Sequence, residues 1–291
     1  MPNTAADLSL LVHRAEAVLT RLEAWLPVPP PAPDWQNRLA FRWRRRGEQG
    51  WIEAIPTPQQ VDLARLTGID QQKQQISRNT AQFVAGKPAN NVLLTGARGT
   101  GKSSLVKAML TQFATQGLRM IEVDKSHLVD LADITWQLAD RPERFIVFCD
   151  DLSFAAEEAS YKALKVALDG TLAAAPENVL IYATSNRRHL IPEYREENEK
   201  TRHNGAEIHP YEATEEKISL SERFGLWLSF YPFDQDTYLA SVALWLEELG
   251  VKIDQPELLR REALQWALTR GARSGRSAWQ FARDFAGRQP G

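Results

Sequence analysis

The sequence contains a single cysteine, Cys149, and only five histidines among its 291 residues. One cysteine excludes both an intramolecular disulfide bond and a cysteine-based zinc cluster. The histidines are scattered along the chain without the spacing of a metal site. We therefore expect neither a disulfide-stabilised fold nor a cysteine- or histidine-ligated metal, and Cys149 is expected to be a buried strand residue.

Long hydrophobic runs and a strong net charge are also missing. No apolar run approaches the roughly 20 residues that a membrane-spanning helix needs. The N-terminal segment lacks the basic start and uninterrupted apolar stretch of a secretory signal, because Asp7, His13, Arg14 and Glu16 interrupt it. A formal net charge of −2 gives no overall attraction to nucleic acid or to anionic membranes. These absences favour a cytoplasmic protein with no membrane partner.

The chain begins with a predicted amphipathic helix over residues 5–26. Six apolar residues alternate spacings of three and four and so share one helical stripe: Leu8, Leu11, Ala15, Val18, Leu22 and Trp25. We expect this stripe to pack on the rest of the protein, with a short coiled coil or a partner-docking helix as the alternative. The proline-rich segment 26–35 then predicts a stiff linker and a boundary.

Residues 39–55 predict two short strands around a Gly-Glu-Gln-Gly turn. The first strand is rich in arginine beside Trp43, and its arginines are Arg42, Arg44, Arg45 and Arg46. Two interpretations remain open: a solvated strand face with one buried tryptophan, or a set of phosphate contacts that would support binding of nucleic acid.

From residue 61 onward, helices and short apolar strands alternate. The predicted strands are 91–95, 119–124, 144–149, 178–184 and 226–231, and the predicted helices between them are 70–86, 102–116 and 157–172. Strands that are apolar on both faces and separated by helices are typical of a covered parallel sheet, so the fold class is α/β. Residues 236–249, 256–270 and 275–287 predict three further helices in a small C-terminal domain.

A glycine-rich loop joins the first of these strands to its helix. Residues 96–103, GARGTGKS, fit the phosphate-loop (Walker A) pattern G-x-x-x-x-G-K-[ST]. Glycines let backbone N–H groups turn toward an anion, and the positive end of the following helix points to the same place. Lys102 is expected to reach the β- and γ-phosphates, and the Ser103 hydroxyl to ligate Mg²⁺. The predicted cofactor contacts are Gly96, Ala97, Arg98, Gly99, Thr100, Gly101, Lys102, Ser103 and Ser104, of which Arg98 is expected to face solvent.

A second (Walker B) motif supplies acids near that loop. FIVFCDD, residues 145–151, ends a buried strand in Asp150 and Asp151. The carboxyl ends of parallel strands meet at the edge of the sheet where ligands of open α/β sheets bind. We expect Asp150 to hold Mg²⁺ and Asp151 to polarise the attacking water.

The order of phosphate loop, FCDD, ATSN (183–186), SERFG (221–225) and C-terminal helices resembles the AAA+ ATPases over residues 61–287. NNVLLTGARGTGKSSLVKA and IYATSNRRHLIPEY look closer still to an uncharacterised bacterial family of ATP-binding proteins within that superfamily. The resemblance implies a three-layer αβα P-loop core with a parallel sheet. The predicted domains are an N-terminal region over 1–60 with the amphipathic helix, the proline-rich linker and the short hairpin, a nucleotide-binding α/β domain over 61–233 and a helical lid domain over 234–291.

The resemblance also assigns roles to individual residues. Asn186 matches the polar sensor that orients the hydrolytic water, with a strand-end turn as the alternative. Arg223 in SERFG matches the arginine finger that reaches a neighbouring subunit's nucleotide, with an intrachain salt bridge as the alternative. Arg276 fits the lid arginine that contacts the γ-phosphate of its own chain, and Arg273 competes for that role.

The segment Leu66–Ile69 resembles the one that covers adenine in the superfamily, so Gly68 and Ile69 join the predicted site. One departure concerns the acids, because most AAA+ proteins carry Asp-Glu where this chain has Asp150-Asp151. Aspartate is one methylene shorter, which leaves a slow, switch-like ATPase open.

The sequence thus predicts an ATPase that uses ATP and Mg²⁺ and assembles into a homo-oligomeric ring or filament to remodel a macromolecular partner. The alternative is a slow ATP-dependent binding switch. Nucleic acid is a candidate partner for it, through the hairpin arginines and a basic lid. The highly charged segment 192–218 is expected to be a surface insertion or a functional loop.

Overall fold

The computed structural model describes residues 4–23, 30–154, 158–170, 176–187 and 222–289. The chain forms two compact units, Met1–Pro33 and Asp34–Gly291. The charged segment 192–218 lies outside the described residues, so its predicted role stays a prediction.

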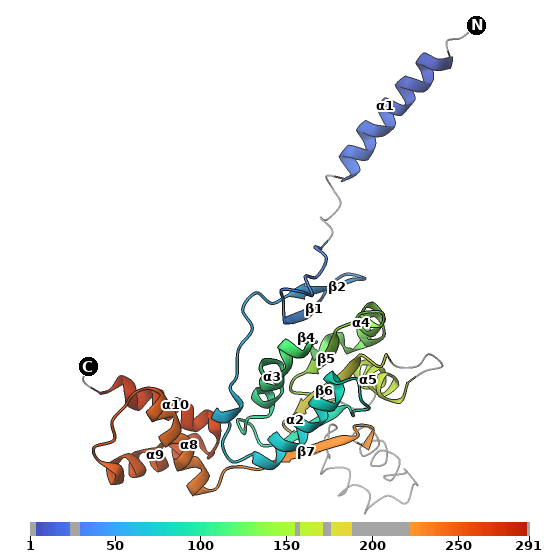
Figure 1. The fold of residues 1–291 in the computed structure, drawn as a ribbon. Helices are drawn as coiled ribbons and strands as arrows, with labels where there is room; N and C mark the ends of the chain where they lie inside the picture. Colours follow the sequence, from blue (N-terminus) through green and yellow to red (C-terminus); the bar gives the residue numbers. More distant parts are fainter. Residues whose placement is uncertain (1–3, 24–29, 155–157, 171–175, 188–221, 290–291) are drawn as a thin grey trace, which may run out of the picture. The chain divides into compact units, whose positions relative to one another are not determined.

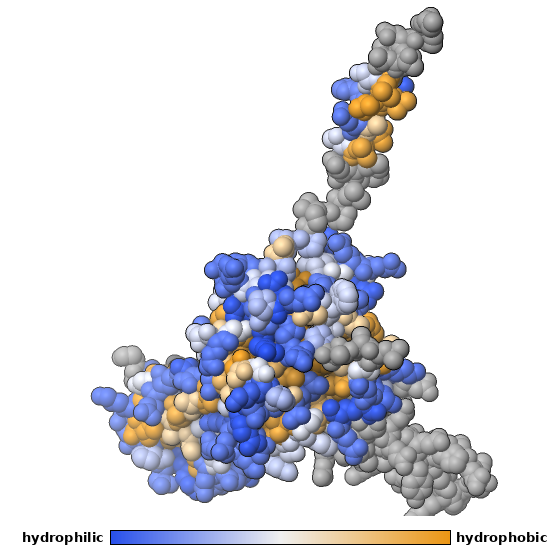
Figure 2. Space-filling model, turned by 45° about the vertical axis from the view of Figure 1, so that its right-hand side comes forward, coloured by the Kyte–Doolittle hydropathy of each residue, from blue (hydrophilic) through white to orange (hydrophobic). Residues whose placement is uncertain are grey.

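The first unit contains one helix, α1, over Thr4–Glu23, as the apolar spacing predicts. Its apolar side chains Leu8, Leu11 and Val18 are exposed, and Figure 2 shows the apolar residues of this helix gathered along one side. The expectation that this stripe packs on the rest of the protein stays a prediction. Trp25, the last residue of the predicted stripe, lies outside the described residues.

The second unit is built on a seven-stranded sheet with the order β2-β1-β4-β5-β6-β3-β7 (Figure 1). The strands are β1 Ala40–Arg46, β2 Gln49–Ala54, β3 Val92–Gly96, β4 Leu118–Glu122, β5 Arg144–Cys149, β6 Val179–Ser185 and β7 Leu226–Phe230. Every neighbouring pair is parallel except β1 and β2, which form an antiparallel hairpin. The α/β class and the parallel sheet are confirmed.

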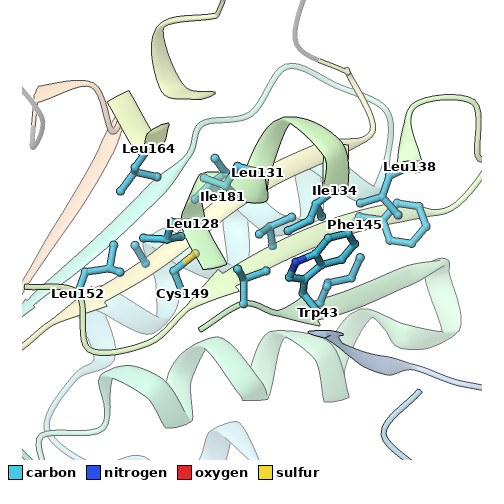
Figure 3. Close-up of a cluster of buried hydrophobic side chains, with 14 of the residues drawn as sticks. Trp43, Leu128, Leu131, Ile134, Leu138, Phe145, Cys149, Leu152, Leu164 and Ile181 are labelled. Carbon is cyan, nitrogen blue, oxygen red and sulfur yellow. The ribbon is translucent and has the colours of Figure 1, made fainter. Parts of the chain in front are cut away.

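Helices cover both faces of this sheet, which gives the three layers. Helices α2 (Asp70–Val84) and α3 (Lys102–Phe113) pack on one face, and α4 (Leu131–Leu138) and α5 (Ala159–Asp169) on the other. The buried strand β5 alternates between the two cores: Phe145, Val147 and Cys149 belong to one, whereas Ile146 and Phe148 belong to the other. Figure 3 shows the first core, with Cys149 among leucines and isoleucines. Burial raises the pKa of the Cys149 thiol to about 12, so this cysteine is an inert core residue.

Two elements on the face of the sheet covered by α4 and α5 were not predicted from the sequence. A 3₁₀ segment, η3 (Lys125–Asp130), and α4 follow β4 and supply Leu128, Leu131 and Ile134 to the core. Two shorter 3₁₀ segments, η1 (Leu63–Arg65) and η2 (Ala114–Gln116), lie elsewhere in the chain. Helix α4 has only eight residues, too few for a clear period in the sequence.

The predicted hairpin is present, but it extends the sheet and does not group with the N-terminal helix, because β1 pairs in parallel with β4. The physical reason is burial, since Phe41 and Trp43 of β1 are 0% and 4% exposed. The chain enters the fold at Trp35, whose carbonyl accepts a hydrogen bond from Arg119 Nε at 2.8 Å. Pairing with a strand some 80 residues away leaves no local signal in the sequence.

The arginines of β1 are largely neutralised. Their acidic partners are Glu122 for Arg42 (3.9 Å), Glu53 for Arg44 (2.9 Å) and Asp130 for Arg45 (2.6 Å). Asp130 also accepts a hydrogen bond from the indole N–H of Trp43 at 2.9 Å. These pairs favour the solvated strand face over a set of phosphate contacts.

The C-terminal region is helical, as predicted. Helices α8 (Gln235–Glu248), α9 (Pro256–Arg270) and α10 (Gly275–Gly287) pack around their own core, which includes Val242, Ala263 and Phe281. The side chains of Asp234 and Ser274 cap the first turns of α8 and α10 by accepting hydrogen bonds from backbone N–H groups. These three helices are called the lid from here on.

Candidate functional site

A cavity of about 830 Å³ lies at the carboxyl edge of the sheet, where β3, β5 and β6 end. The loop after β3, the segment before α2 and the lid line three of its sides. Ligands of open α/β sheets bind at this edge because the strand ends and helix N-termini converge there. All of these elements belong to the second compact unit.

Two glycines in the loop after β3 lie where a side chain would clash with a neighbouring residue. Gly96 has a φ of +131°, and a Cβ there would lie 1.9 Å from the carbonyl oxygen of Phe230 in β7. At Gly99, a Cβ would lie 2.8 Å from Ser274 Oγ and 3.0 Å from Arg276 Cβ. The loop is therefore pressed between the last strand of the sheet and the first turn of α10.

Lys102, the first residue of α3, is buried with 5% exposure. Its ammonium donates to the carbonyl oxygens of Gly96 (2.8 Å) and Ala97 (2.7 Å) and to Asn186 Oδ1 (3.0 Å). Burial lowers the pKa of Lys102 to about 8, although the charges of Asp150 and Asp151 oppose the shift. A buried ammonium at the start of a helix has the chemistry that suits an anion.

Asp150 accepts hydrogen bonds from hydroxyl groups of two other elements. Its Oδ1 accepts hydrogen bonds from Ser103 Oγ at 2.6 Å and from Thr184 Oγ1. The Thr184 hydroxyl also accepts a hydrogen bond from the backbone N–H of Asp151 at 2.9 Å. Thr184 was not among the predicted site residues; the signal available in the sequence was a hydroxyl inside the apolar run of β6.

Asp151 is the one described non-glycine residue with a positive φ, at +53°. Its carboxylate accepts a hydrogen bond from Asn186 Nδ2, and the same amide group contacts Lys102 through Oδ1. Asn186 therefore links the buried ammonium to the carboxylate that follows β5. The structure brings Lys102 and Ser103, at the start of α3, together with Asp150, Asp151 and Asn186, which follow the ends of β5 and β6.

The predicted arginines lie in different places. Arg276 lines the cavity, and its backbone N–H donates to the carbonyl oxygen of Gly99 at 3.2 Å. Arg273 is not among the described residues that line it. Arg98 is exposed and lines the rim. Arg223 forms an ion pair with Asp169 at the end of α5, the intrachain salt bridge named as its alternative, and does not line this chain's cavity within the described residues.

The segment before α2 contributes unequally. Ile69 is buried and lines the cavity together with Leu66 and Thr67. Gly68 does not line it in the described structure; a Cβ there would lie 2.4 Å from Thr237 Cγ2, so this glycine permits close packing on α8. Trp245 and Trp279 of the lid also line the cavity, and neither was among the predicted site residues.

The fold of the second unit is the AAA+ P-loop fold. The ORC1 protein of Aeropyrum pernix, solved in complex with DNA, has a TM-score of 0.54 and 16% identity, covering 78% of this chain and 62% of that one. A chain of the HORMA:CdnC:Trip13 complex of E. coli MS115-1 has a TM-score of 0.50 and 16% identity, covering 76% of this chain and 90% of that one. At such identity the likeness establishes the fold alone.

The chain belongs to the family described as "Protein of unknown function (DUF815)", whose model matches residues 36–289. A comparison with curated proteins found no match. Among the described residues, no helix is both long enough and apolar enough to cross a bilayer.

Proposed function

We propose that the protein binds ATP with Mg²⁺ in this cavity and hydrolyses it. The observation that carries the proposal is the buried ammonium of Lys102, which lies beside the phosphate loop and donates a hydrogen bond to Asn186. The backbone N–H groups of residues 99–103 and the Lys102 ammonium would bind the phosphates. Segment Leu66–Ile69 would lie against the nucleoside.

The residues around Asp150 fit a magnesium ion. Mg²⁺ prefers oxygen ligands, keeps several waters and uses one or two protein groups with the substrate phosphates. The Ser103 hydroxyl and the Asp150 carboxylate already lie 2.6 Å apart and supply two such oxygens. Among the described residues, no group of three or more acidic, histidine or cysteine side chains could hold a metal ion.

The remaining polar residues are assigned to the reaction. Asp151 accepts a proton from, or orients, the attacking water, and Asn186 holds its carboxylate in position. When bound, the magnesium neutralises charge on the phosphates. Arg276 lines the cavity and is assigned to stabilise negative charge on the γ-phosphate. Arg223, which does not line this cavity in the described structure, is assigned to the nucleotide of a neighbouring copy in a ring or filament.

A slow binding switch is the second candidate function. The Asp151 carboxylate is held by Asn186 and is shorter than the glutamate that most AAA+ proteins carry. Under this candidate, ATP occupancy docks a macromolecular partner and turnover is incidental. Nucleic acid is the less favoured partner, because three hairpin arginines are paired with acids.

Titration calorimetry with MgATP and a steady-state phosphate-release assay test the proposal together. We expect wild-type protein to bind MgATP and Lys102→Ala to lose most of the affinity. Turnover of many ATP molecules per second on adding a substrate would reject the switch, whereas tight binding without turnover would favour it. Absence of nucleotide binding by the wild-type protein would overturn both candidates.

A further inference from the structure

The cavity continues beyond the phosphate loop into the lid. Trp245 of α8 and Trp279 of α10 line this end, with ring centroids 4.6 Å apart and planes inclined at 55°. Both side chains are half-buried, so part of each indole is open to the cavity. The guanidinium of Arg283 lies over the Trp279 ring, with Cζ 5.7 Å from the ring centroid, so the part of the two indoles open to the cavity is the surface available to a flat, apolar group.

Two aliphatic side chains line the cavity next to the phosphate loop. Ile69 and Leu66 border the phosphate loop directly, because a Cβ at Gly101 would lie 3.6 Å from Ile69 Cδ1 and 3.9 Å from Leu66 Cδ2. A ligand whose phosphates lie on the loop would therefore extend between these side chains and the two tryptophans. An anionic end joined to a flat apolar end is the chemistry of a nucleotide.

We propose that Trp245 and Trp279 form an aromatic wall that stacks the nucleotide base, and that the site selects purines by their ring faces. This inference rests on the proposed function and adds its base specificity. Stacking on an aromatic face tolerates any base and strengthens with ring area, so adenine and guanine bind alike and pyrimidines bind more weakly.

Three polar side chains that line the cavity already have partners within the chain. Arg65 pairs with Glu248 of α8. Gln59 Oε1 accepts a hydrogen bond from Lys107 Nζ at 3.1 Å, and Asp62 Oδ1 accepts one from the backbone N–H of Ala64 at 2.9 Å.

The wall also connects the base to the chemistry. Trp279 and Arg276 lie three residues apart on α10, so their side chains are neighbours on one face of that helix. A base stacked on Trp279 therefore helps to hold Arg276 at the phosphates. Inorganic triphosphate occupies the loop without this effect.

Competition against a fluorescent ATP analogue carrying a methylanthraniloyl group tests the wall, with ATP, GTP, CTP and tripolyphosphate as probes. We expect Trp245→Ala and Trp279→Ala each to weaken ATP and GTP binding roughly tenfold, as loss of one stacking contact does. Tripolyphosphate affinity should not change. Trp136→Ala is the matched control, since Trp136 is 82% exposed on α4 and does not line the cavity.

Phenylalanine variants keep the test valid if the alanine variants fold poorly. Trp279→Phe preserves a stacking face, so ATP affinity should recover while energy transfer from tryptophan to the bound analogue falls. Unchanged ATP affinity in well-folded alanine variants, or an equal loss of tripolyphosphate affinity, would overturn the wall and leave the phosphate site intact. CTP binding as tight as ATP binding would also overturn it. Wild-type protein that binds no nucleotide refutes the proposed function itself.

Discussion

Asp151 shows at the residue scale why this chain carries Asp-Asp. Its φ of +53° is a left-handed conformation that aspartate and asparagine tolerate better than longer side chains, because their short polar group bonds to nearby backbone. A glutamate there would reach farther toward a phosphate at a higher conformational cost. The short acid is thus consistent with the local backbone.

We predict that Asp151→Asn keeps ATP affinity and folding but loses most hydrolysis, because asparagine tolerates the same backbone and lacks the carboxylate. Phosphate release and calorimetric ATP binding measure the two effects. Asp151→Glu is the companion variant, and we expect it to lower the free energy of unfolding by about 1 kcal/mol. Wild-type turnover in Asp151→Asn would remove this residue from the mechanism.

A second prediction separates the two lid arginines. Arg276→Ala should reduce the hydrolysis rate at saturating ATP, because Arg276 lines the cavity. Arg273→Ala is its matched control, since Arg273 is absent from the described lining residues, and it should hydrolyse ATP at close to the wild-type rate. The reverse result would assign the lid role to Arg273.

The placement of single residues at the cavity was predictable where a short motif fixes their position. Lys102, Ser103 and Asp150 follow from the loop pattern and from the end of an apolar strand. Thr184 was not predictable in the same way, because its role depends on β5 and β6 lying side by side. Trp245 and Trp279 were missed for a related reason, since helical spacing does not say which side of the lid faces a cavity.

At the scale of elements, Gly96 ties β3 to β7. We predict that Gly96→Ala lowers the free energy of unfolding by about 1–3 kcal/mol more than Gly117→Ala, because its Cβ would overlap a backbone carbonyl. Gly117 is the matched control: its φ is also positive, at +90°, but nothing lies within 4 Å of a Cβ there. Urea unfolding measures both variants. Equal losses would mean that the loop adjusts to the added methyl group.

The elements themselves were predictable to different degrees. Strands β3, β5 and β6 are apolar runs bounded by turns and polar residues, so the sequence marks them. Hairpin strand β1 was recognised, but its place in the sheet was not, because the parallel partner β4 is distant in sequence. Burial of Trp43 against Asp130 fixes that edge, and no local pattern encodes such a contact.

At the scale of the whole molecule, Arg223 decides whether the site is complete in one chain. Its guanidinium pairs with Asp169 at the end of α5, and it does not line the cavity of its own chain in the described structure. If the pair is only structural, then Asp169→Asn and Arg223→Ala should have the same effect on hydrolysis. We predict instead that Asp169→Asn retains hydrolysis and that Arg223→Ala loses it, with ATP affinity unchanged in both variants.

Mixing two inactive variants tests the proposed oligomer directly. Lys102→Ala chains should bind little nucleotide but keep Arg223, whereas Arg223→Ala chains should bind nucleotide but lack the arginine. In a ring or filament, an intact Arg223 from one chain would meet an occupied site on the next, and such an arginine is worth roughly 10³–10⁵ in rate. We therefore predict that the mixture hydrolyses ATP although each variant alone does not, with activity rising with protein concentration. If the mixture stays inactive while light scattering shows mixed oligomers, Arg223 does not act on a neighbour.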